Sequence, residues 1–551
     1  MKSKKVLTII LFALILGAAC FVRLYKLNEI PAGVYVDEAS LGYNSYSLLL
    51  TGRDEFGKSW PLFLRSFSIF QPPLYSILSM IFIYFIGLSI FSTRFLSVIS
   101  GLTVILVTFL LFYTSDIKNK LKLSIVATFL VAFSPWAIFD SRAALEANLG
   151  LALTAIGILF LALSLKKRRF FILACLVFSI SAYAYHAERV IGILFPIAFL
   201  YIYKKIFLKS KKLVIVSFLL FLLIQTPQYI SLTKPGSLSR FETQGYTQES
   251  TFLKYGYSLV HIPVFGRPLY ILRQFTSQYL SVFSPRSLFY EPEPQLVRSI
   301  PNLSVFYVWM IFPFFIGFAQ IWKQKSKYLI KLIFLLMIIG PLPEAITGDP
   351  FYTLRMLPCI WGMALMIAFG INAIFDKLNR NYTKILLAAS LIVISGLNFY
   401  VCYFILLKYE RSIWYGYPFE VLAQITEGNK NQKFVLDSPV YDAPYIWMAF
   451  YKKYDPVKLQ AQTPPGLLDH YYDDLTYYRY KTIDNVEVRN VKWGEDPCKD
   501  EYLVGDNLAI SDVQAKEHKL TLVREIKDLS GKTILWLFHT NPQLSCPNSK
   551  D

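Results

Sequence analysis

Two adjacent carboxylates, Asp37 and Glu38, stand in a polar stretch that follows the first apolar run of the chain. This stretch, 27–91, is far longer than the handful of residues that usually joins two helices. In a loop at a membrane surface, a carboxylate can act as a general base toward an acceptor hydroxyl, or it can bind a divalent cation. Most acids in loops are simply solvated. The pair alone therefore does not indicate a catalytic or metal-binding site, and the rest of the sequence must support that interpretation.

A second pair of charges, Arg142 and Glu146, lies in a short break between apolar runs. Because they are spaced four apart, the two side chains could form an ion pair on one helical turn. The functional interpretation is that Glu146 is a second carboxylate that faces the first pair, and that Arg142 orients it.

A third group, formed by His186, Glu188 and Arg189, interrupts apolar sequence between two runs. An ionisable group at the membrane centre costs about 2.5–3.5 kcal/mol on insertion scales, so such groups usually serve a purpose. Arg189 is a candidate clamp for a phosphate, whereas a lone histidine such as His186 is more often structural than a ligand.

Arg355 opens a late apolar run, close to Glu344 and Asp349. A guanidinium held at the level of the lipid headgroups can bind the phosphate of an anionic lipid. The alternative is an interfacial arginine that extends its charged end to water. The six cysteines lack metal-ligand spacing, and no Walker or dinucleotide glycine motif occurs at a strand–helix junction.

Membrane helices must position these charges. Of the 551 residues, 55% are hydrophobic, and roughly ten apolar runs have the ~17–25 residues needed to cross the hydrocarbon core. The net charge of +19 does not indicate a nucleic-acid partner, because Lys and Arg gather in the short loops between the runs. That pattern orients membrane proteins with their basic loops in the cytoplasm.

The basic loops also decide which runs cross the membrane. If 74–90 crossed, the basic loops at 116–122, 166–169 and 204–212 would all lie outside. We therefore predict that 74–90 is a juxtamembrane helix along the outer interface. About eleven spans remain, at 6–22, 94–113, 122–139, 148–165, 170–185, 189–204, 213–231, 303–322, 328–345, 353–375 and 384–407.

This topology places the N-terminus in the cytoplasm. The segments outside are the loop 27–91, the long loop 232–302, the tail 408–551 and two short turns at 140–146 and 344–352. The membrane part, 1–407, would be catalytic, and the strand-like runs at 433–436 and 532–538 predict that the tail is a small α/β domain. Outside the cytoplasm Cys498 and Cys546 could form a disulfide; the alternative is two free thiols.

Several motifs recur in a defined order along the chain. They are Asp37-Glu38, Gly52, Pro72-Pro73-Leu74, Phe91 with Arg94, Ser141-Arg142 with Glu146, and Arg355 with Leu357 and Pro358. Taken together they resemble the GT-C class of glycosyltransferases, and within it the superfamily of protein O-mannosyltransferases and aminoarabinose transferases (glycosyltransferase family 39). The resemblance covers residues 5–405, and its specificity lies in the order and spacing of the motifs.

The resemblance implies a polytopic GT-C fold that transfers a sugar, with inversion, from a polyprenyl-phosphate donor on the outer face of the plasma membrane. The acceptor would be a glycan, a lipid or a protein. Asp37 would be the catalytic carboxylate, with Glu38 beside it. Arg355 would hold the donor phosphate, together with Arg189 and His186.

Two departures from the family pattern matter. Glu146 stands where the family usually has Asp, at a position that aids acceptor or metal binding. His186-Ala-Glu-Arg189 stands where the family often has Lys, which leaves the phosphate ligand open. Metal dependence varies across the class, so a divalent cation stays open, and no other cofactor is implied.

Three other functions compete with the glycosyltransferase. A transporter or flippase for a lipid-linked glycan usually shows paired half-repeats and broken helices, and neither is visible. A polysaccharide polymerase or ligase would have no use for the early Asp-Glu loop, so an enzyme that survives Asp37→Ala would favour it. A receptor-like protein would bind a partner through its tail. We favour the glycosyltransferase.

Overall fold

The computed structural model describes residues 2–67, 69–231, 264–324, 327–349, 351–441, 443–474, 476 and 478–546. The chain divides into two compact units. The first comprises Met1–Tyr25, Pro72–Tyr75 and Arg94–Cys402, and the second comprises Lys26–Gln71, Ser76–Thr93 and Tyr403–Asp551. Residues of the long first loop therefore belong to the same unit as the C-terminal tail.

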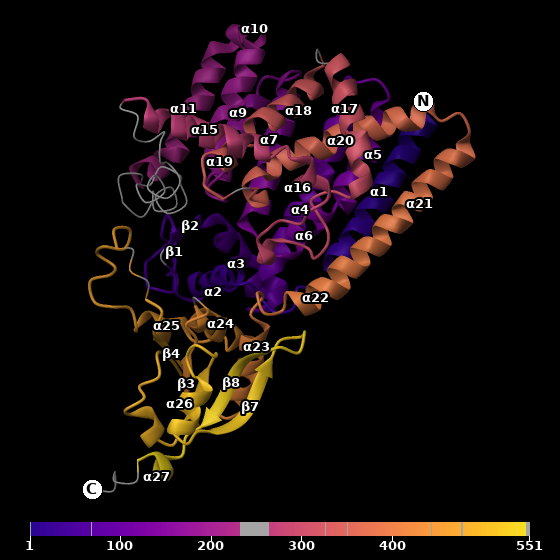
Figure 1. Ribbon diagram of the computed structural model, residues 1–551. Helices are drawn as coiled ribbons and strands as arrows, with labels where there is room; N and C mark the ends of the chain where they lie inside the picture. The colour runs from indigo at the N-terminus through magenta and orange to yellow at the C-terminus, as the bar shows by residue number, and fades with distance from the viewer. Residues whose placement is uncertain are drawn as a thin grey trace. The chain divides into compact units, whose positions relative to one another are not determined.

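The first unit is helical, as the apolar runs predict, and helices occupy every predicted span position (Figure 1). Its helices are α1 (Lys2–Leu24), α4 (Ile90–Thr114), α5 (Lys120–Phe133), α6 (Pro135–Arg142), α7 (Glu146–Ser164), α8 (Phe170–Ser181), α9 (Glu188–Ile202), α10 (Lys204–Phe207), α11 (Lys211–Ser231), α15 (Gly266–Ser281), α16 (Pro285–Phe289), α17 (Ile311–Lys323), α18 (Tyr328–Ile339), α19 (Leu342–Ala345), α20 (Leu357–Lys377) and α21 (Asn381–Phe399). Of the predicted outer loop 232–302, residues 232–263 lie outside the described part.

Fewer of these helices are long enough to cross a membrane than the predicted number of about eleven spans. Among the described residues, 6 helices have the length and hydropathy of a span, or 7 if the bent pair α5 and α6 counts as one. Others, such as α8 with 12 residues and α17 with 13, are apolar but shorter. Length read from hydropathy alone overestimates a helix wherever the apolar run continues into a turn.

The predicted span 122–139 is not one straight helix. It bends by 54° between α5 and α6, where Ser134 is extended and Pro135 begins the second helix. Proline has no backbone N–H and disfavours a helical residue before it, so it starts a helix better than it continues one. Asp140 and Arg142 therefore lie on α6, a short helix whose axis differs from that of α5.

Helix α20 is the buried centre of the first unit. It packs against α5, α7, α17 and α18 (Figure 1), and its first 14 residues, 357–370, are all buried. Gly317 of α17 and Gly370 of α20 allow the closest approach, because a Cβ at either position would collide with a backbone carbonyl of the other helix. Small residues at such crossings are how membrane helices gain close packing.

The second unit combines the first loop with an α/β domain. The loop forms α2 (Val36–Thr51), a hairpin of β1 (Leu64–Ser66) and β2 (Ile69–Gln71), and α3 (Leu74–Ile86). The tail contains α22 (Leu407–Glu410), α23 (Tyr417–Gly428), β3 (Phe434–Asp437), α24 (Pro444–Tyr451), α25 (Pro456–Gln460), β4 (Lys481–Ile483), β5 (Val486–Val488), β6 (Tyr502–Gly505), α26 (Asp512–Glu517), β7 (Thr521–Lys527), β8 (Thr533–His539) and α27 (Pro542–Ser545). Helix α3 is apolar and has 13 residues, too short for a span. That it lies along the membrane surface stays a prediction.

The tail domain is built on a six-stranded sheet in the order β4-β5-β3-β6-β8-β7. Strand β3 pairs in parallel with β5 and β6, and the remaining pairs are antiparallel. The two strand-like runs of the sequence became β3 and β8, which confirms the predicted α/β class. All four residues of β3 are buried, with Phe434 and Leu436 in the core beside α24, as expected for a central strand.

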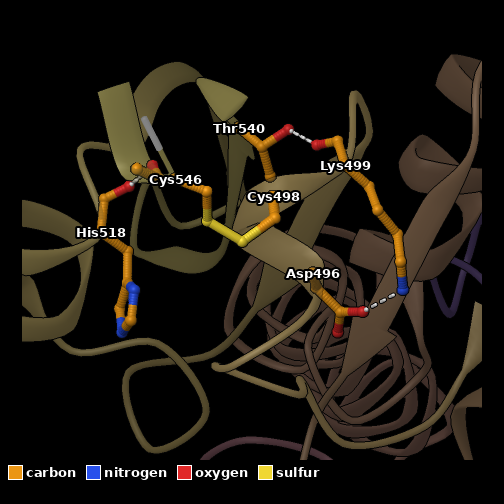
Figure 2. Close-up of a disulfide and its surroundings, with 7 residues drawn as sticks. Asp496, Cys498, Lys499, His518, Thr540 and Cys546 are labelled. Atoms are coloured by element: carbon orange, nitrogen blue, oxygen red, sulfur yellow. Dashed lines mark hydrogen bonds and ion pairs between the residues drawn. A yellow bond between two sulfur atoms is a disulfide. The ribbon is translucent and has the colours of Figure 1, made fainter. Parts of the chain in front are cut away.

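A disulfide joins Cys498 to Cys546 near the C-terminal end of this domain, as Figure 2 shows. Of the two alternatives that the sequence left open, the structure contains the paired form. The bridge connects α27 to the turn before β6. Beside it the hydroxyl of Thr540 donates to the carbonyl oxygen of Lys499, and Lys499 Nζ lies 3.4 Å from Asp496 Oδ1 (Figure 2).

Candidate active site

Asp37 and Glu38 lie in the first turn of α2, and the structure gives them different surroundings. Tyr35 is extended, α2 begins at Val36, and the Glu38 Oε2 atom accepts a hydrogen bond of 3.0 Å from the backbone N–H of Tyr35. This is the glutamate half of a capping box, which satisfies a backbone donor at the start of a helix. Glu38 is fully buried, whereas Asp37 is partly exposed.

Helix α2 is held inside the second unit by the tail. The Tyr43 hydroxyl donates to the carbonyl oxygen of Tyr454 at 3.0 Å. A Cβ at Gly42 would collide with Thr93 and Phe450, so the helix approaches these neighbours at glycine distance. The position of Asp37 therefore depends on contacts between α2 and tail residues that are more than 400 positions away in sequence.

Arg142 is the last residue of α6, and its side chain is fully buried. Its Nη1 atom donates to the carbonyl oxygens of Val22 and Arg23, at 2.7 and 2.9 Å. These carbonyls are at the C-terminal end of α1, where the helix has no internal partners for them. Arg142 therefore ties α6 to the end of α1, a structural role that the sequence did not indicate.

Arg23 completes the same junction from the other side. It is fully buried, and it donates to the carbonyl oxygens of Ala132 in α5 (3.0 Å) and Ala137 in α6 (3.2 Å). Sequence analysis missed this residue. The available signal was an arginine near the end of an apolar run, which is also the signal of an ordinary interfacial arginine.

Glu146 is the first residue of α7 and is 8% exposed. The break at 143–145 separates it from Arg142, so the two do not share a helical turn, contrary to one interpretation of their spacing. The start of α7 is fixed to α4, because the amide of Asn148 donates to the carbonyl oxygen of Ser97 at 2.9 Å. A carboxylate at this end of a helix is favoured by the helix dipole.

His186 lies in the turn between α8 and α9, and Glu188 and Arg189 are the first two residues of α9. Glu188 is buried and accepts a hydrogen bond from the Thr154 hydroxyl, so it fastens α9 to α7. His186 and Arg189 are both partly exposed. Of the three, Glu188 has the clearest structural role, and the other two have the exposure that a ligand would need.

Arg355 lies in the short 3₁₀ turn before α20, and it is held by two carboxylates. Its Nη2 atom is 3.3 Å from Asp349 Oδ2, and its Nη1 atom is 3.8 Å from Glu344 Oε2. The Thr347 hydroxyl also accepts from Nη1 at 2.6 Å. The three ionisable residues noted around this turn in the sequence therefore converge.

The other half of this group had no recognisable motif in the sequence. Arg298 donates from Nε to Glu293 Oε1 at 2.9 Å, and Glu293 also accepts from the Thr353 hydroxyl. The guanidinium carbon of Arg298 lies 3.4 Å from the centre of the Tyr352 ring, and that of Arg355 lies 3.9 Å from the same centre. Cationic groups over an aromatic face are attracted to it.

We call the six residues Glu293, Arg298, Glu344, Asp349, Tyr352 and Arg355 the Tyr352 cluster. Burial raises the pKa of Glu293, against the opposing effects of Arg298 and of the Thr353 hydroxyl. Tyr185, next to His186, lies within electrostatic range of Arg298. The cluster thus gathers two arginines at the turn before α20.

The seven candidate residues are divided between the two units. Asp37 and Glu38 belong to the second unit, and Arg142, Glu146, His186, Arg189 and Arg355 belong to the first. Within the described ranges, no group of three or more His, Cys, Asp or Glu side chains converges as a set of metal ligands.

The helical bundle, the long first loop and the C-terminal α/β domain define the GT-C fold of polytopic membrane glycosyltransferases. Two crystal structures of ArnT from Cupriavidus metallidurans share it. The apo form matches 98% of this chain and 99% of its own, at 11% identity and a TM-score of 0.54. The form bound to undecaprenyl phosphate matches the same shares, at 12% identity and a TM-score of 0.53.

A third similar structure is the archaeal oligosaccharyltransferase AglB from Archaeoglobus fulgidus, in complex with an inhibitory peptide and a dolichol-phosphate. It matches 99% of this chain and 75% of its own, at 12% identity and a TM-score of 0.51. No protein-family model matches the sequence, and neither does a curated protein. At these identities the likeness establishes the fold, and the activity must be argued from the residues.

Proposed function

We propose that the protein is an integral membrane glycosyltransferase that moves a sugar from a polyprenyl-phosphate donor to an acceptor hydroxyl, with inversion, on the outer face of the membrane. The observation that carries the proposal is a GT-C fold that extends over 98% of the chain. One of the similar structures contains undecaprenyl phosphate and another contains dolichol-phosphate. Both ligands are polyprenyl phosphates, the chemical class proposed for this donor.

The reaction would be a single displacement. The acceptor oxygen attacks the anomeric carbon while the bond from that carbon to the phosphate oxygen breaks, so the configuration inverts. Asp37 takes the proton of the acceptor hydroxyl. The polyprenyl phosphate leaves with the bonding electrons and gains a negative charge, which a guanidinium can stabilise.

The surroundings of the two adjacent acids favour Asp37 as the base. Glu38 is buried and bonded to the backbone of Tyr35, whereas Asp37 is partly exposed. A general base must reach the hydroxyl that it deprotonates, which a side chain enclosed in a helix cap cannot do. Glu38 would then position Asp37 by fixing the start of α2.

Arg355 is the proposed ligand of the donor phosphate. It lies in the turn just before the buried helix α20, and one of its carboxylate partners, Asp349, is 48% exposed. An incoming phosphate could replace this partner, because charge-assisted bonds from arginine to phosphate have the same fork geometry as those to carboxylate. His186 would assist from the turn before α9, and Arg189 from the first turn of α9. Glu146 would face the acceptor or a divalent cation.

The orientation that we propose puts the N-terminus in the cytoplasm and 408–551 outside the plasma membrane. The charge pattern of the loops supports it. The Cys498–Cys546 disulfide also supports it, because such bonds persist in oxidising compartments. In this arrangement 1–407 is the catalytic domain, and 232–302 together with the tail would contribute to acceptor choice.

Sugar transfer in membranes from cells that express the wild type or Asp37→Asn would test the proposal. Labelled polyprenyl-phosphate sugars are offered one at a time, at matched protein abundance. We expect the wild type to consume one donor and the folded variant to be inactive. Glu38→Gln is the matched control, and it should retain transfer. An Asp37→Asn variant as active as the wild type would remove the proposed base and favour a transporter, polymerase or ligase.

A further inference from the structure

Arg298 is the cation of the Tyr352 cluster for which the proposed function has no role. It comes from the loop after α16, and it reaches the same tyrosine ring as Arg355, which comes from the turn before α20. The guanidinium carbons of Arg298 and Arg355 lie 3.4 and 3.9 Å from the centre of the Tyr352 ring, so the distance between the two carbons cannot exceed the sum of these values. That separation is within the reach of a single phosphoryl group hydrogen-bonded on two sides.

The carboxylates of the cluster hold the two guanidiniums unequally. Glu293, 4% exposed, bonds Arg298 and is itself fixed by the Thr353 hydroxyl. Arg355 is bonded to Asp349, which is 48% exposed, and lies farther from the buried Glu344. A side chain as exposed as Asp349 can turn into water and be replaced, whereas Glu293 cannot. Arg298 is therefore a fixed cation beside an exchangeable ion pair.

Arg298 also keeps a donor without a partner. Its Nε atom is bonded to Glu293, but its Nη2 atom is buried and has no hydrogen-bond partner among the described residues. Buried N–H groups are almost always bonded, because leaving one unbonded is costly. A charged donor left open inside a polar cluster is the condition expected of a ligand site before its anion arrives.

We propose that Arg298 is a second ligand of the donor phosphate, acting beside Arg355 on the ring of Tyr352. The inference rests on the proposed function and deepens it. The anion is the phosphate at the end of a polyprenyl chain, a diester in the donor and a monoester in the released product, and it enters by displacing Asp349 from Arg355.

The chemistry gives a reason for two arginines. While the sugar is attached, the phosphate is a diester with one negative charge. As the bond to the anomeric carbon breaks, it becomes a monoester with two. Cations that are in place before this charge develops stabilise the transition state more than the bound donor. Arg298 would thus contribute more to the rate of transfer, and to binding of the released polyprenyl phosphate, than to binding of the intact donor.

The test is binding of undecaprenyl phosphate to the purified full chain in detergent, compared with binding of undecaprenol, which lacks the phosphate. The ratio of the two affinities is measured for the wild type, Arg298→Gln and Arg298→Lys. We expect the ratio to fall about tenfold in Arg298→Gln and less in Arg298→Lys. Because both ligands are compared within one preparation, a loss of folded protein cancels from the ratio.

Arg286→Gln is the matched control, because Arg286 lies in α16, just before the loop that carries Arg298, and forms an exposed ion pair with Glu291. Its ratio should equal that of the wild type. Arg355→Gln separates this inference from the proposed function. If Arg355→Gln lowers the ratio and Arg298→Gln does not, Arg298 is not a phosphate ligand and only this inference fails. If the wild type itself binds undecaprenyl phosphate no better than undecaprenol, the proposed function fails with it.

Discussion

Arg355 Nη2 lies 3.3 Å from Asp349 Oδ2, in the turn that leads into α20. The arginine is 9% exposed and the aspartate 48%, so the pair joins a buried cation to an anion at the surface. A phosphate that needs Arg355 must compete with this contact. The ion pair is therefore an obstacle to donor binding as well as a support for the empty site.

The first prediction concerns the removal of this competitor. Asp349→Asn should bind undecaprenyl phosphate about two- to fivefold more tightly than the wild type, since an exposed ion pair is worth up to ~1 kcal/mol. Titration of the purified chain measures the change. Asp376→Asn is the control, because Asp376 forms a comparable surface pair with Lys122 at 2.7 Å. Weaker binding by Asp349→Asn would mean that Asp349 helps to hold the ligand.

The second prediction separates the two acids of α2. Glu38→Ala should lower the stability of the protein by about 1 kcal/mol, because the backbone N–H of Tyr35 loses its acceptor at a helix start. Glu38→Gln keeps a carbonyl oxygen for that bond and should change stability little. Thermal unfolding in detergent compares the two variants. Equal melting temperatures for Glu38→Ala and the wild type would remove the capping role.

The third prediction tests the junction of α1 and α6. Arg142→Ala leaves the carbonyl oxygens of Val22 and Arg23 without the guanidinium that they now bond. Two hydrogen bonds to a charged group correspond to about 3 kcal/mol or more. We expect a lower melting temperature and a lower yield of folded protein. Arg380→Ala, at an exposed arginine, should change neither. If Arg142→Ala were as stable as the wild type, the structural role of Arg142 would be wrong, and the acceptor role proposed from the sequence would be favoured.

The positions of the helices were predictable from sequence because a span is a local property. An apolar run of sufficient length must form a helix in a membrane, whatever its neighbours are. The same holds for β3 and β8, whose β-branched and aromatic residues favour strands. Pro135 is a signal in the sequence for the bend between α5 and α6. The single span predicted at 122–139 was based on hydropathy alone and did not take this proline into account.

The site was less predictable because its contacts are not local. The Thr353 hydroxyl and Glu293 form a hydrogen bond although they are 60 positions apart in sequence. The residues around either position do not indicate this contact. Arg298 stands in a loop rich in polar residues, where an arginine is ordinary. Asp37 and Arg355 were found through motifs in a family-like order, and the structure does not test the roles assigned to them.

The fourth prediction concerns the disulfide. Under denaturing conditions without reductant, a thiol-reactive polymer should label Cys20, Cys175, Cys359 and Cys402, and reduction should expose Cys498 and Cys546 as well. Replacing both bridged cysteines by serine should cost about 2–4 kcal/mol, the usual effect of a disulfide. Labelling of all six cysteines before reduction would show that the bond is absent from the protein as expressed.

The last prediction follows from two buried acids in the first loop, Asp54 and Glu55. Asp54 accepts hydrogen bonds from the Tyr471 hydroxyl and from the backbone N–H of Phe56. Glu55 accepts from Asn44 at 3.1 Å and from the Tyr445 hydroxyl at 3.0 Å. Both acids therefore link the loop to the tail within the second unit.

Burial raises the pKa of Asp54 from 3.8 to about 6 and that of Glu55 from 4.5 to about 7. The folded protein thus binds protons more readily than the unfolded chain, so these acids make stability fall as the pH rises from about 4 to about 7.

Glu55→Gln removes one of these two acids. Its melting temperature should rise relative to that of the wild type over this range, and the difference should level off above about pH 7. Glu427→Gln, at an exposed acid whose pKa is lowered by its bond to Lys430, should show no such rise. A Glu55→Gln difference that is constant from pH 4 to pH 8 would mean that folding does not raise the pKa of Glu55, and that a cation, with Lys481 as the candidate, offsets the cost of burying its charge.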